Sequence, residues 1–268
     1  MDRCNWRAGS HNRGQAPQSR AGKDRPISAG TNIRAVVFDL DDTLYPEREY
    51  IRSGYRAVSR HLEAAFGPQT VCAWPMPPAE WLWQRFLAGD SARAFNALDE
   101  EFHLGLSDGR IAELVEVYRT HRPAVAPYPG VRETLEALGG NLALGLLSDG
   151  FLPAQQFKLD ALRLEPHFAA VLFTETLGRD CWKPSPAGFE AVRSQLHVDH
   201  VACAYVADNP AKDFVAPNCL GWQTIQYIRP NQIHASNPPA EAGRPMHVVR
   251  TDEQLRQALS ADGNAPRG

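Results

Sequence analysis

The stretch IRAVVFDLDDTL, residues 33–44, joins a short apolar run to a cluster of three carboxylates. The apolar run is brief and rich in β-branched residues, which is typical of a buried strand. Asp39, Asp41 and Asp42 follow where this strand would end, and open α/β folds bind ligands at the carboxyl ends of their strands. Carboxylates this close repel one another unless a cation lies among them. The stretch therefore indicates an α/β fold with a metal site at one edge of the sheet.

The spacing of these acids suits covalent catalysis by a carboxylate. Asp39 and Asp41 are two residues apart, so in a turn one can attack an electrophile while the other handles a proton. Thr43 would supply a hydroxyl that holds the free oxygen of the nucleophile. The same residues could instead form a loop of solvated acids that caps a strand, and the stretch alone leaves both interpretations open.

Polar residues follow other predicted elements in a way that favours a catalytic site. They are the turn Ser148-Asp149-Gly150 after an apolar run, Lys183 before a proline, and Asp208 and Asp213 after another apolar run. A hydroxyl and the backbone N–H groups of a glycine-containing turn can bind phosphate directly. Each feature is common by chance, but all four motifs in this order are not expected by accident.

With these four motifs the chain resembles the haloacid dehalogenase superfamily, most of whose members are magnesium-dependent phosphatases. The resemblance covers about residues 33–228, and Ala207 stands where family members usually have glycine. It implies that Asp39 is the nucleophile and that Asp41 is the general acid and base. It further implies phosphoryl contacts from Ser148 and Lys183, a Mg²⁺ ion held by Asp39, Asp208 and the backbone carbonyl of Asp41, and supporting roles for Thr43 and Asp213.

Helical and strand patterns alternate after residue 128, which is the βαβ signature of a parallel sheet covered on both faces. Strands are predicted at 142–147, 170–173, 201–206, 222–227 and 246–249, and helices at 131–138, 153–162, 186–196, 210–219 and 252–259. Between the first two motifs, apolar spacings of three and four predict helices at 47–66, 79–87, 91–104 and 108–121. This insert resembles the family's helical cap of the C1 type.

The predicted fold class is thus α/β, a doubly wound, Rossmann-like parallel-sheet core with an inserted all-helical cap. The core comprises residues 33–45 and 128–260, and the cap comprises residues 46–127. The basic segment 1–32 and the segment 261–268 are predicted to be disordered tails, because neither can bury enough apolar surface to offset its ordering entropy.

The composition excludes several classes of partner. A net charge of −3 over 268 residues gives no overall attraction for nucleic acid, and no run of eighteen apolar residues could span a membrane. The first thirty residues lack the apolar segment of a secretory signal. We therefore expect a cytoplasmic protein, monomeric or homodimeric, whose partner is a small-molecule phosphomonoester.

The predicted function is Mg²⁺-dependent hydrolysis of such a monoester, a sugar phosphate or nucleoside monophosphate for example, through an aspartyl-phosphate. The leaving group would contact residues near the motifs, with Tyr45, Tyr55 and Trp182 as candidates. The residue types at these positions do not predict the identity of the substrate.

Rival activities on the same fold differ in the residues they need. A 2-haloacid dehalogenase needs neither a metal nor a second acid, so Asp41 and Asp208 argue against it. A phosphonatase needs a lysine in the cap, and the chain has none between Lys23 and Lys158. A sugar phosphomutase keeps both aspartates and stays open. A scaffold that retained only the fold would be expected to have lost at least one catalytic residue, and none is lost.

Overall fold

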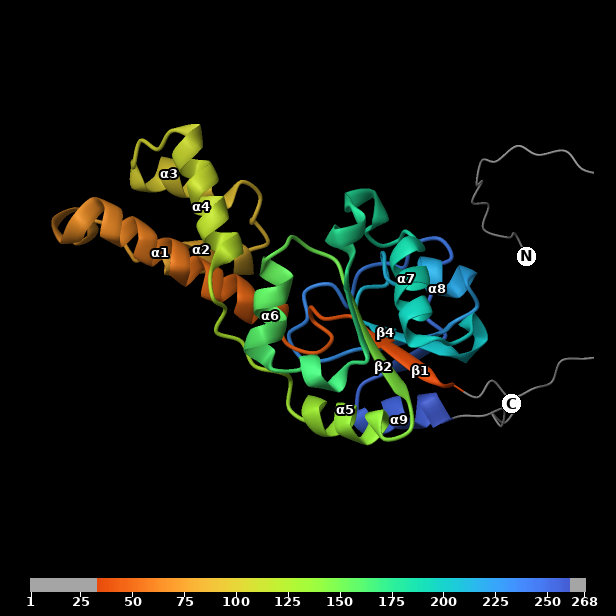
Figure 1. Cartoon of the computed structure of the whole chain (residues 1–268). Coiled ribbons are helices and arrows are strands. Elements are labelled where there is room, and N and C mark those ends of the chain that lie inside the picture. The colour runs from red at the N-terminus through yellow and green to blue at the C-terminus, as the bar shows by residue number, and fades with distance from the viewer. Residues whose placement is uncertain (1–32, 261–268) are drawn as a thin grey trace, which may run out of the picture.

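The computed structural model describes residues 33–260, which form a parallel sheet with helices on both faces and a helical unit projecting from it (Figure 1). This is the α/β architecture predicted from the sequence. The two predicted tails, residues 1–32 and 261–268, lie outside the described residues. No helix within residues 33–260 is both long enough and apolar enough to cross a membrane.

Six parallel strands form the sheet in the order β3-β2-β1-β4-β5-β6. They are β1 (Ala35–Phe38), β2 (Ala143–Ser148), β3 (Ala170–Phe173), β4 (Cys203–Ala207), β5 (Gln223–Tyr227) and β6 (His247–Val249). The chain moves outward from β1 through β2 to β3 and then returns to the other side of β1 with β4. The neighbouring strands β1 and β4 therefore flank the topological switch point, where a crevice opens beyond their carboxyl ends.

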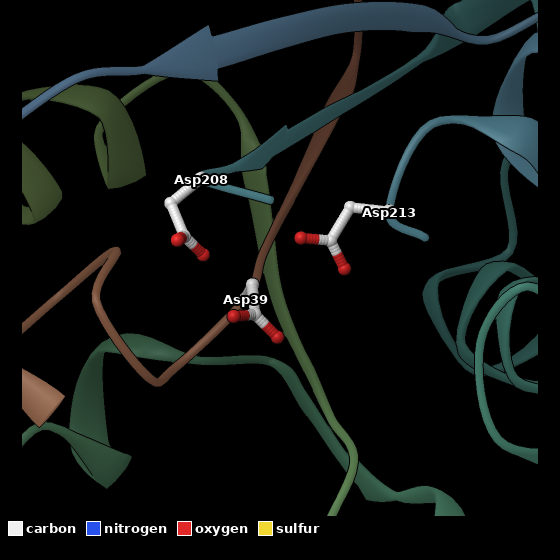
Figure 2. Close-up of side chains that lie close together, drawn as sticks. All are labelled: Asp39, Asp208 and Asp213. Carbon is white, nitrogen blue, oxygen red and sulfur yellow. The ribbon is translucent and has the colours of Figure 1, made fainter. Parts of the chain in front are cut away.

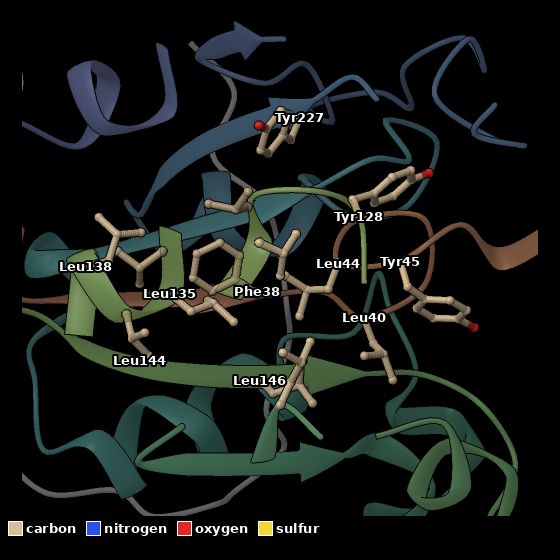
Figure 3. Close-up of a cluster of buried hydrophobic side chains, with 14 of the residues drawn as sticks. Phe38, Leu40, Leu44, Tyr45, Tyr128, Leu135, Leu138, Leu144, Leu146 and Tyr227 are labelled. Carbon is tan, nitrogen blue, oxygen red and sulfur yellow. The ribbon is translucent and has the colours of Figure 1, made fainter. Parts of the chain in front are cut away.

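Helices cover the two faces of the sheet, and each face has its own apolar core. The helices of the core are α5 (Val131–Gly139), α6 (Ala154–Leu162), α7 (Ala187–Leu196), α8 (Val215–Cys219) and α9 (Asp252–Ser260). Side chains of β1 alternate between the faces, as the pleat requires. Val36 and Phe38 pack with α5, α6 and α9, whereas Ala35 and Val37 pack with α7 and α8. Figure 3 shows the first of these clusters around Phe38.

The inserted segment forms a helical unit with a separate apolar core. Its helices are α1 (Glu47–Val71), α2 (Pro78–Leu87), α3 (Ala94–Phe102) and α4 (Asp108–Thr120), and they enclose buried residues such as Leu62 and Leu98. Helical dihedrals in α1 break at Gly67, with φ 76°, before the chain continues to Val71. The sequence predicts this break at Gly67, and the further turn beyond it extends the element to Val71.

The two connections between the core and the helical unit lie side by side, next to the carboxyl end of β1. The chain enters the unit just after Leu44 and Tyr45, and it returns at Tyr128. The backbone N–H of Tyr128 donates to the carbonyl of Leu44 at 3.0 Å. The unit is therefore attached to the core at one place, next to the carboxyl end of β1.

One predicted helix is shorter than expected, whereas the other boundaries after α1 agree to within three residues. The pattern predicts a helix over 210–219, but α8 begins only at Val215. Local side-chain bonds replace helical ones in the missing part: Asp213 accepts from the N–H of Asn209 at 3.0 Å, and Asn209 accepts from the N–H of Ala211 at 3.1 Å. Asn and Asp compete with the helix ladder in this way at turns.

Candidate active site

Three buried carboxylates meet in the crevice beyond β1 and β4, and Figure 2 shows them facing one another. Asp39 follows β1 directly, Asp208 follows β4, and Asp213 lies in the turn before α8. The backbone N–H of Asp39 still donates to Val206 at 2.9 Å, which extends the ladder between the two strands. One oxygen from each carboxylate lies within 4.8 Å of the others. Among the described residues, Oδ2 of Asp208 has no hydrogen-bond partner although it is buried.

Crowding changes the protonation of this acidic centre. Burial raises the pKa of Asp39 to about 7, although the ammonium of Lys183 opposes the shift. Burial, followed by the charges of Asp213 and Asp39, raises the pKa of Asp208 to about 10. A divalent cation among the oxygens would favour the charged carboxylates and reverse both shifts. The donor set, with its unpartnered buried oxygen, therefore fits a hard cation such as Mg²⁺.

Lys183 provides the buried positive charge beside this centre. Its Nζ lies 2.5 Å from Oδ1 of Asp39 and 2.9 Å from Oδ1 of Asp213, and it donates to the hydroxyl of Tyr205 at 3.0 Å. Burial alone would lower the pKa of Lys183, but the charges of Asp213 and Asp39 hold it well above its usual value. The lysine is thus charged and fixed in orientation, with Asp213 as one of the groups that hold it.

The Asp41 carboxylate is not one of the three clustered acids, and it has its own set of donors. Lys158 contacts Oδ1 at 2.8 Å and Oδ2 at 3.1 Å, and Gln155 donates to Oδ2 at 3.0 Å. The hydroxyl of Tyr45 also donates to Oδ1. Burial would raise the pKa of Asp41, but the charge of Lys158 and these hydrogen bonds outweigh it and lower the pKa below its usual value.

The turn after β2 is polar, and hydrogen bonds tie it to neighbouring segments. Ser148 is buried at its start. The carboxylate of Asp149 accepts from the hydroxyl of Thr174 at 2.8 Å and faces Nζ of Lys212 at 3.5 Å. Gly150 has φ 139°, and a Cβ there would lie 2.0 Å from Nε2 of Gln155. Glycine is therefore required at this position both by the backbone and by the close side chain.

A cavity of about 420 Å³ connects these groups to the helical unit. Its floor includes Asp39, Asp41 and Asp208, and its walls come from core loops and from the helices α1, α4 and α6. The wall residues with polar or aromatic side chains are Glu47, Tyr50, Tyr118, Arg119, Asp149, Phe151, Gln155, Lys158, Trp182, Asn209, Lys212 and His234. This volume suits a small organic phosphate.

Of the three residues predicted to contact the substrate, one lines this cavity and two lie elsewhere. Trp182 lines the cavity, with its ring 5.5 Å from that of Phe151, and its contact with the leaving group stays a prediction. The expectation for Tyr45 is wrong, because its side chain is fully buried and its hydroxyl is bound to Asp41. Tyr55 is also misplaced by the sequence argument: it packs in the core of the helical unit and lines a second cavity there. The Thr43 hydroxyl is buried and makes no hydrogen bond to any described residue.

Sequence reasoning missed several residues that line or support the cavity. Gln155 and Lys158 are three apart on α6, just after the Ser148 turn, and they reach Asp41 from there. A compositional signal was present, because the chain has only four lysines and three of them lie at this site. Arg119 enters from α4, and no pattern in the sequence marked it.

The switch-point crevice, the buried acids and the adjoining lysine are the features of a Rossmann-like hydrolase. The family model for the haloacid dehalogenase-like hydrolases matches residues 33–221, and the chain belongs to this family. It is a phosphatase-like member of the superfamily.

Relatives with known names support this placement. The chain is 30% identical over 227 residues to the phosphoserine phosphatase of Thermus thermophilus, covering 80% of this chain and 88% of the relative. It is 28% identical over 205 residues to the glyceraldehyde 3-phosphate phosphatase of Methanopyrus kandleri, covering 74% and 84%.

Solved structures share the fold. A 2-haloacid dehalogenase from Pseudomonas syringae is 28% identical, with a TM-score of 0.55 over 85% of this chain and 98% of the other. A magnesium-bound HAD-hydrolase from Bacillus subtilis is 18% identical, with a TM-score of 0.59 over 86% and 100%. The second likeness bears on the fold alone.

Proposed function

We propose that this protein is a Mg²⁺-dependent phosphatase that hydrolyses a small phosphomonoester through an aspartyl-phosphate at Asp39. The observation that carries the proposal is the position of Asp39. Its buried carboxylate ends β1, contacts Lys183, faces Asp208 and Asp213, and lines the cavity. Two relatives named as phosphatases of small phosphate esters support the same reaction class.

The residues suited to hold Mg²⁺ are Asp39, Asp208, Asp213 and the backbone carbonyl of Asp41. When bound, the ion would neutralise charge on the phosphate ester and on the crowded acids. Lys183 places a second positive charge beside the nucleophile, and Ser148 with the N–H groups of its turn would bind another phosphoryl oxygen.

The chemistry then needs two proton transfers. An oxygen of Asp39 attacks phosphorus, the ester P–O bond breaks, and Asp41 gives a proton to the departing alkoxide. Because Asp41 is charged in the free site, the proton that it donates must first be taken up from solvent or from a monoanionic ester. In the second half, Asp41 takes a proton from the water that attacks the aspartyl-phosphate, which restores Asp39 and releases inorganic phosphate. The helical unit would act as a cap that excludes bulk water and contacts the leaving group, since α1 and α4 supply part of the cavity wall.

A 2-haloacid dehalogenase is the second candidate, because one similar solved structure bears that name. That activity would use Asp39 alone and leave Asp41 and the acidic pair Asp208 and Asp213 without a role. A sugar phosphomutase would use both aspartates but release no phosphate. The cytoplasm as compartment, and a monomer or homodimer as the assembly, stay predictions.

A substrate panel separates these activities. The purified full-length protein would be assayed for phosphate release with Mg²⁺ on phosphoserine, glyceraldehyde 3-phosphate, sugar phosphates, nucleoside monophosphates and para-nitrophenyl phosphate. Phosphate released in step with substrate loss supports the phosphatase. Metal-independent halide release from a 2-haloacid, isomerised sugar phosphate without phosphate release, or no turnover at all would each replace it with another function.

A further inference from the structure

Lys158 is a buried lysine that the steps above do not use. It lies on α6, its side chain is 5% exposed, and its ammonium lies at the cavity wall. A buried ammonium is costly unless a carboxylate and other electron-rich groups surround it. The partners of Lys158 therefore indicate what it does.

The first partner of Lys158 is the carboxylate of Asp41, and the ammonium contacts both of its oxygens. The distances from Nζ are 2.8 Å to Oδ1 and 3.1 Å to Oδ2, and Gln155, one helical turn earlier, donates to Oδ2 at 3.0 Å. Gln155 also donates to the backbone carbonyl of Asp149. With Tyr45 on Oδ1, donors reach the carboxylate from both the first-motif loop and α6. The plane of the carboxylate is thus fixed.

Its second partner is the ring of Tyr50, which belongs to α1 of the helical unit. Nζ lies 4.1 Å from the ring centroid, within the range of a cation–π contact. The hydroxyl of Tyr50 donates to the carbonyl of Tyr118 on α4 at 3.4 Å. The ammonium of Lys158 is therefore enclosed between the catalytic loop and the helical unit.

We propose that Lys158 is a positioning residue that holds the Asp41 carboxylate toward the leaving-group oxygen, with Gln155 as the second donor and Tyr50 closing the far side. The proposal rests on the phosphatase function proposed above. A carboxylate that can rotate spends little time in line with the proton it must transfer, and small misplacements of catalytic groups reduce rates strongly. The positive charge toward phosphate comes from other residues, Lys183 beside Asp39 and Lys212 beside Asp149.

The test is a leaving-group series on the full-length protein with Mg²⁺. In Lys158→Met, we expect kcat for alkyl phosphates to fall about 10- to 100-fold, part of the 10²- to 10⁴-fold that acid–base catalysis supplies. Aryl phosphates have good leaving groups that need little protonation, so their turnover should fall no more than about threefold in the first chemical step. KM should change little for either class.

A double variant distinguishes action through Asp41 from any other role. If Lys158 works through Asp41, adding Lys158→Met to Asp41→Asn should cause no further loss on alkyl phosphates, since residues that act as a unit are not additive. Lys212→Met is the matched control. Lys212 lines the same cavity but does not contact Asp41, so its loss should affect alkyl and aryl substrates equally and should add fully to Asp41→Asn.

Gln155→Leu provides a second measurement should Lys158→Met fold poorly. It should show the same alkyl-selective loss, smaller in size, with thermal melting as the check on folding. Equal losses on alkyl and aryl substrates in both variants, or a full further loss in the Asp41→Asn background, would overturn the positioning role while wild-type turnover still supports the phosphatase. Absence of wild-type turnover on every phosphomonoester would instead refute the function on which the role depends.

Discussion

The ammonium nitrogen of Lys183 lies 2.5 Å from a carboxylate oxygen of Asp39, although the two residues are 144 positions apart in the chain. Both side chains are buried, and Asp213 contacts the same ammonium at 2.9 Å. Asp39 therefore has its counter-charge in place before substrate arrives. The carboxylate of Asp39 is thus buried and paired, and it still lines the cavity.

Replacing the nucleophile should abolish turnover. Asp39→Asn keeps the shape of the side chain but removes the attacking anion and a metal ligand. We expect kcat/KM to fall by at least about a thousandfold, more than about 4 kcal/mol of transition-state stabilisation. Steady-state phosphate release measures this, and retention of a tenth of wild-type activity would exclude covalent catalysis at Asp39.

Asp42→Asn is the matched control in the same loop. Its carboxylate accepts from the backbone N–H groups of Glu47 at 2.8 Å and of Ile233 at 2.6 Å, so it shapes the turn. The variant should lower the melting temperature and leave kcat/KM within about tenfold of wild type, since the amide oxygen keeps one of these turn hydrogen bonds and the other, worth about 1 kcal/mol, is lost.

Metal exchange should distinguish ions by size. EDTA should stop turnover, Mg²⁺ should restore it, and Ca²⁺ should inhibit. Ca²⁺ is larger and takes more oxygen ligands, so it would tend to bind both oxygens of Asp39 and leave no free nucleophile. Full activity in EDTA, measured after the protein has been stripped of metal and assayed in chelated buffer, would rule out the metal requirement.

The metal-free protein should lose stability as the pH rises from 7 to 9. In this window Asp208 keeps a proton in the native state, because its pKa is raised to about 10, whereas the unfolded chain has released that proton near its ordinary value of 3.8. The native state thus binds more protons, and Asp208 alone makes the free energy of unfolding fall by about 1.4 kcal/mol per pH unit. Asp39, with a pKa raised to about 7, and Glu47, whose pKa burial raises to about 8, add to this fall at the lower end of the window. His121 and His234, whose pKa values are lowered, are neutral in the native state, and since the unfolded imidazoles are mostly neutral above pH 7 they oppose the fall only slightly at its lower end.

Urea unfolding in EDTA at pH 7, 8 and 9 measures this slope. Asp208→Asn should make the slope shallower, most clearly between pH 8 and 9, and saturating Mg²⁺ should stabilise the protein more at pH 9 than at pH 7. Stability that rises with pH in EDTA would show that Asp208 is charged without metal.

Removing the general acid should affect substrates according to their leaving group. Asp41→Asn should reduce alkyl phosphate turnover by about 10² to 10⁴ and reduce aryl phosphate cleavage much less. The aspartyl-phosphate should also accumulate, because its hydrolysis lacks a base, and acid quenching with labelled substrate would trap it. An equal loss on both substrate classes without accumulation would mean that Asp41 does not transfer these protons.

Arg119 should select substrates that carry a carboxylate. It lines the cavity from α4 with its guanidinium 3.9 Å from the ring centre of Phe151, and no carboxylate among residues 33–260 forms an ion pair with it. Arg119→Met should raise KM for phosphoserine about tenfold, because a hydrogen bond to a charged group is lost. Phosphoethanolamine, which lacks the carboxylate, should be unaffected.

Arg110→Met serves as the control on the same helix. Arg110 is exposed and paired with Glu113 at 2.7 Å, away from the cavity, so its removal should leave both KM values unchanged. Similar KM changes for phosphoserine and phosphoethanolamine in Arg119→Met would contradict a carboxylate contact.

The sequence could predict the sheet and the floor of the site because both depend on short-range patterns. Asp39, Ser148 and Asp208 each follow or end a strand, and parallel strands bring their carboxyl ends to one edge. The walls could not be predicted in the same way. Lys158 and Arg119 lie on helices. The apolar periodicity of a helix predicts which of its faces is buried, but it does not predict which polar side chain contacts a loop that is distant in the sequence. Tyr45 has the apolar and polar character of a substrate contact, and only the packing shows that its hydroxyl is bound to Asp41.

The hydrogen bond between Tyr128 and Leu44 has a consequence for how such enzymes diversify. Because the helical unit leaves and re-enters the core at adjacent residues, its length and shape can change without shifting the register of any strand. A different insert grafted between Tyr45 and Tyr128 would meet the same catalytic floor. The part of the cavity wall that α1 and α4 supply therefore joins the core at a single junction, and recombination there could give the same reaction a new substrate.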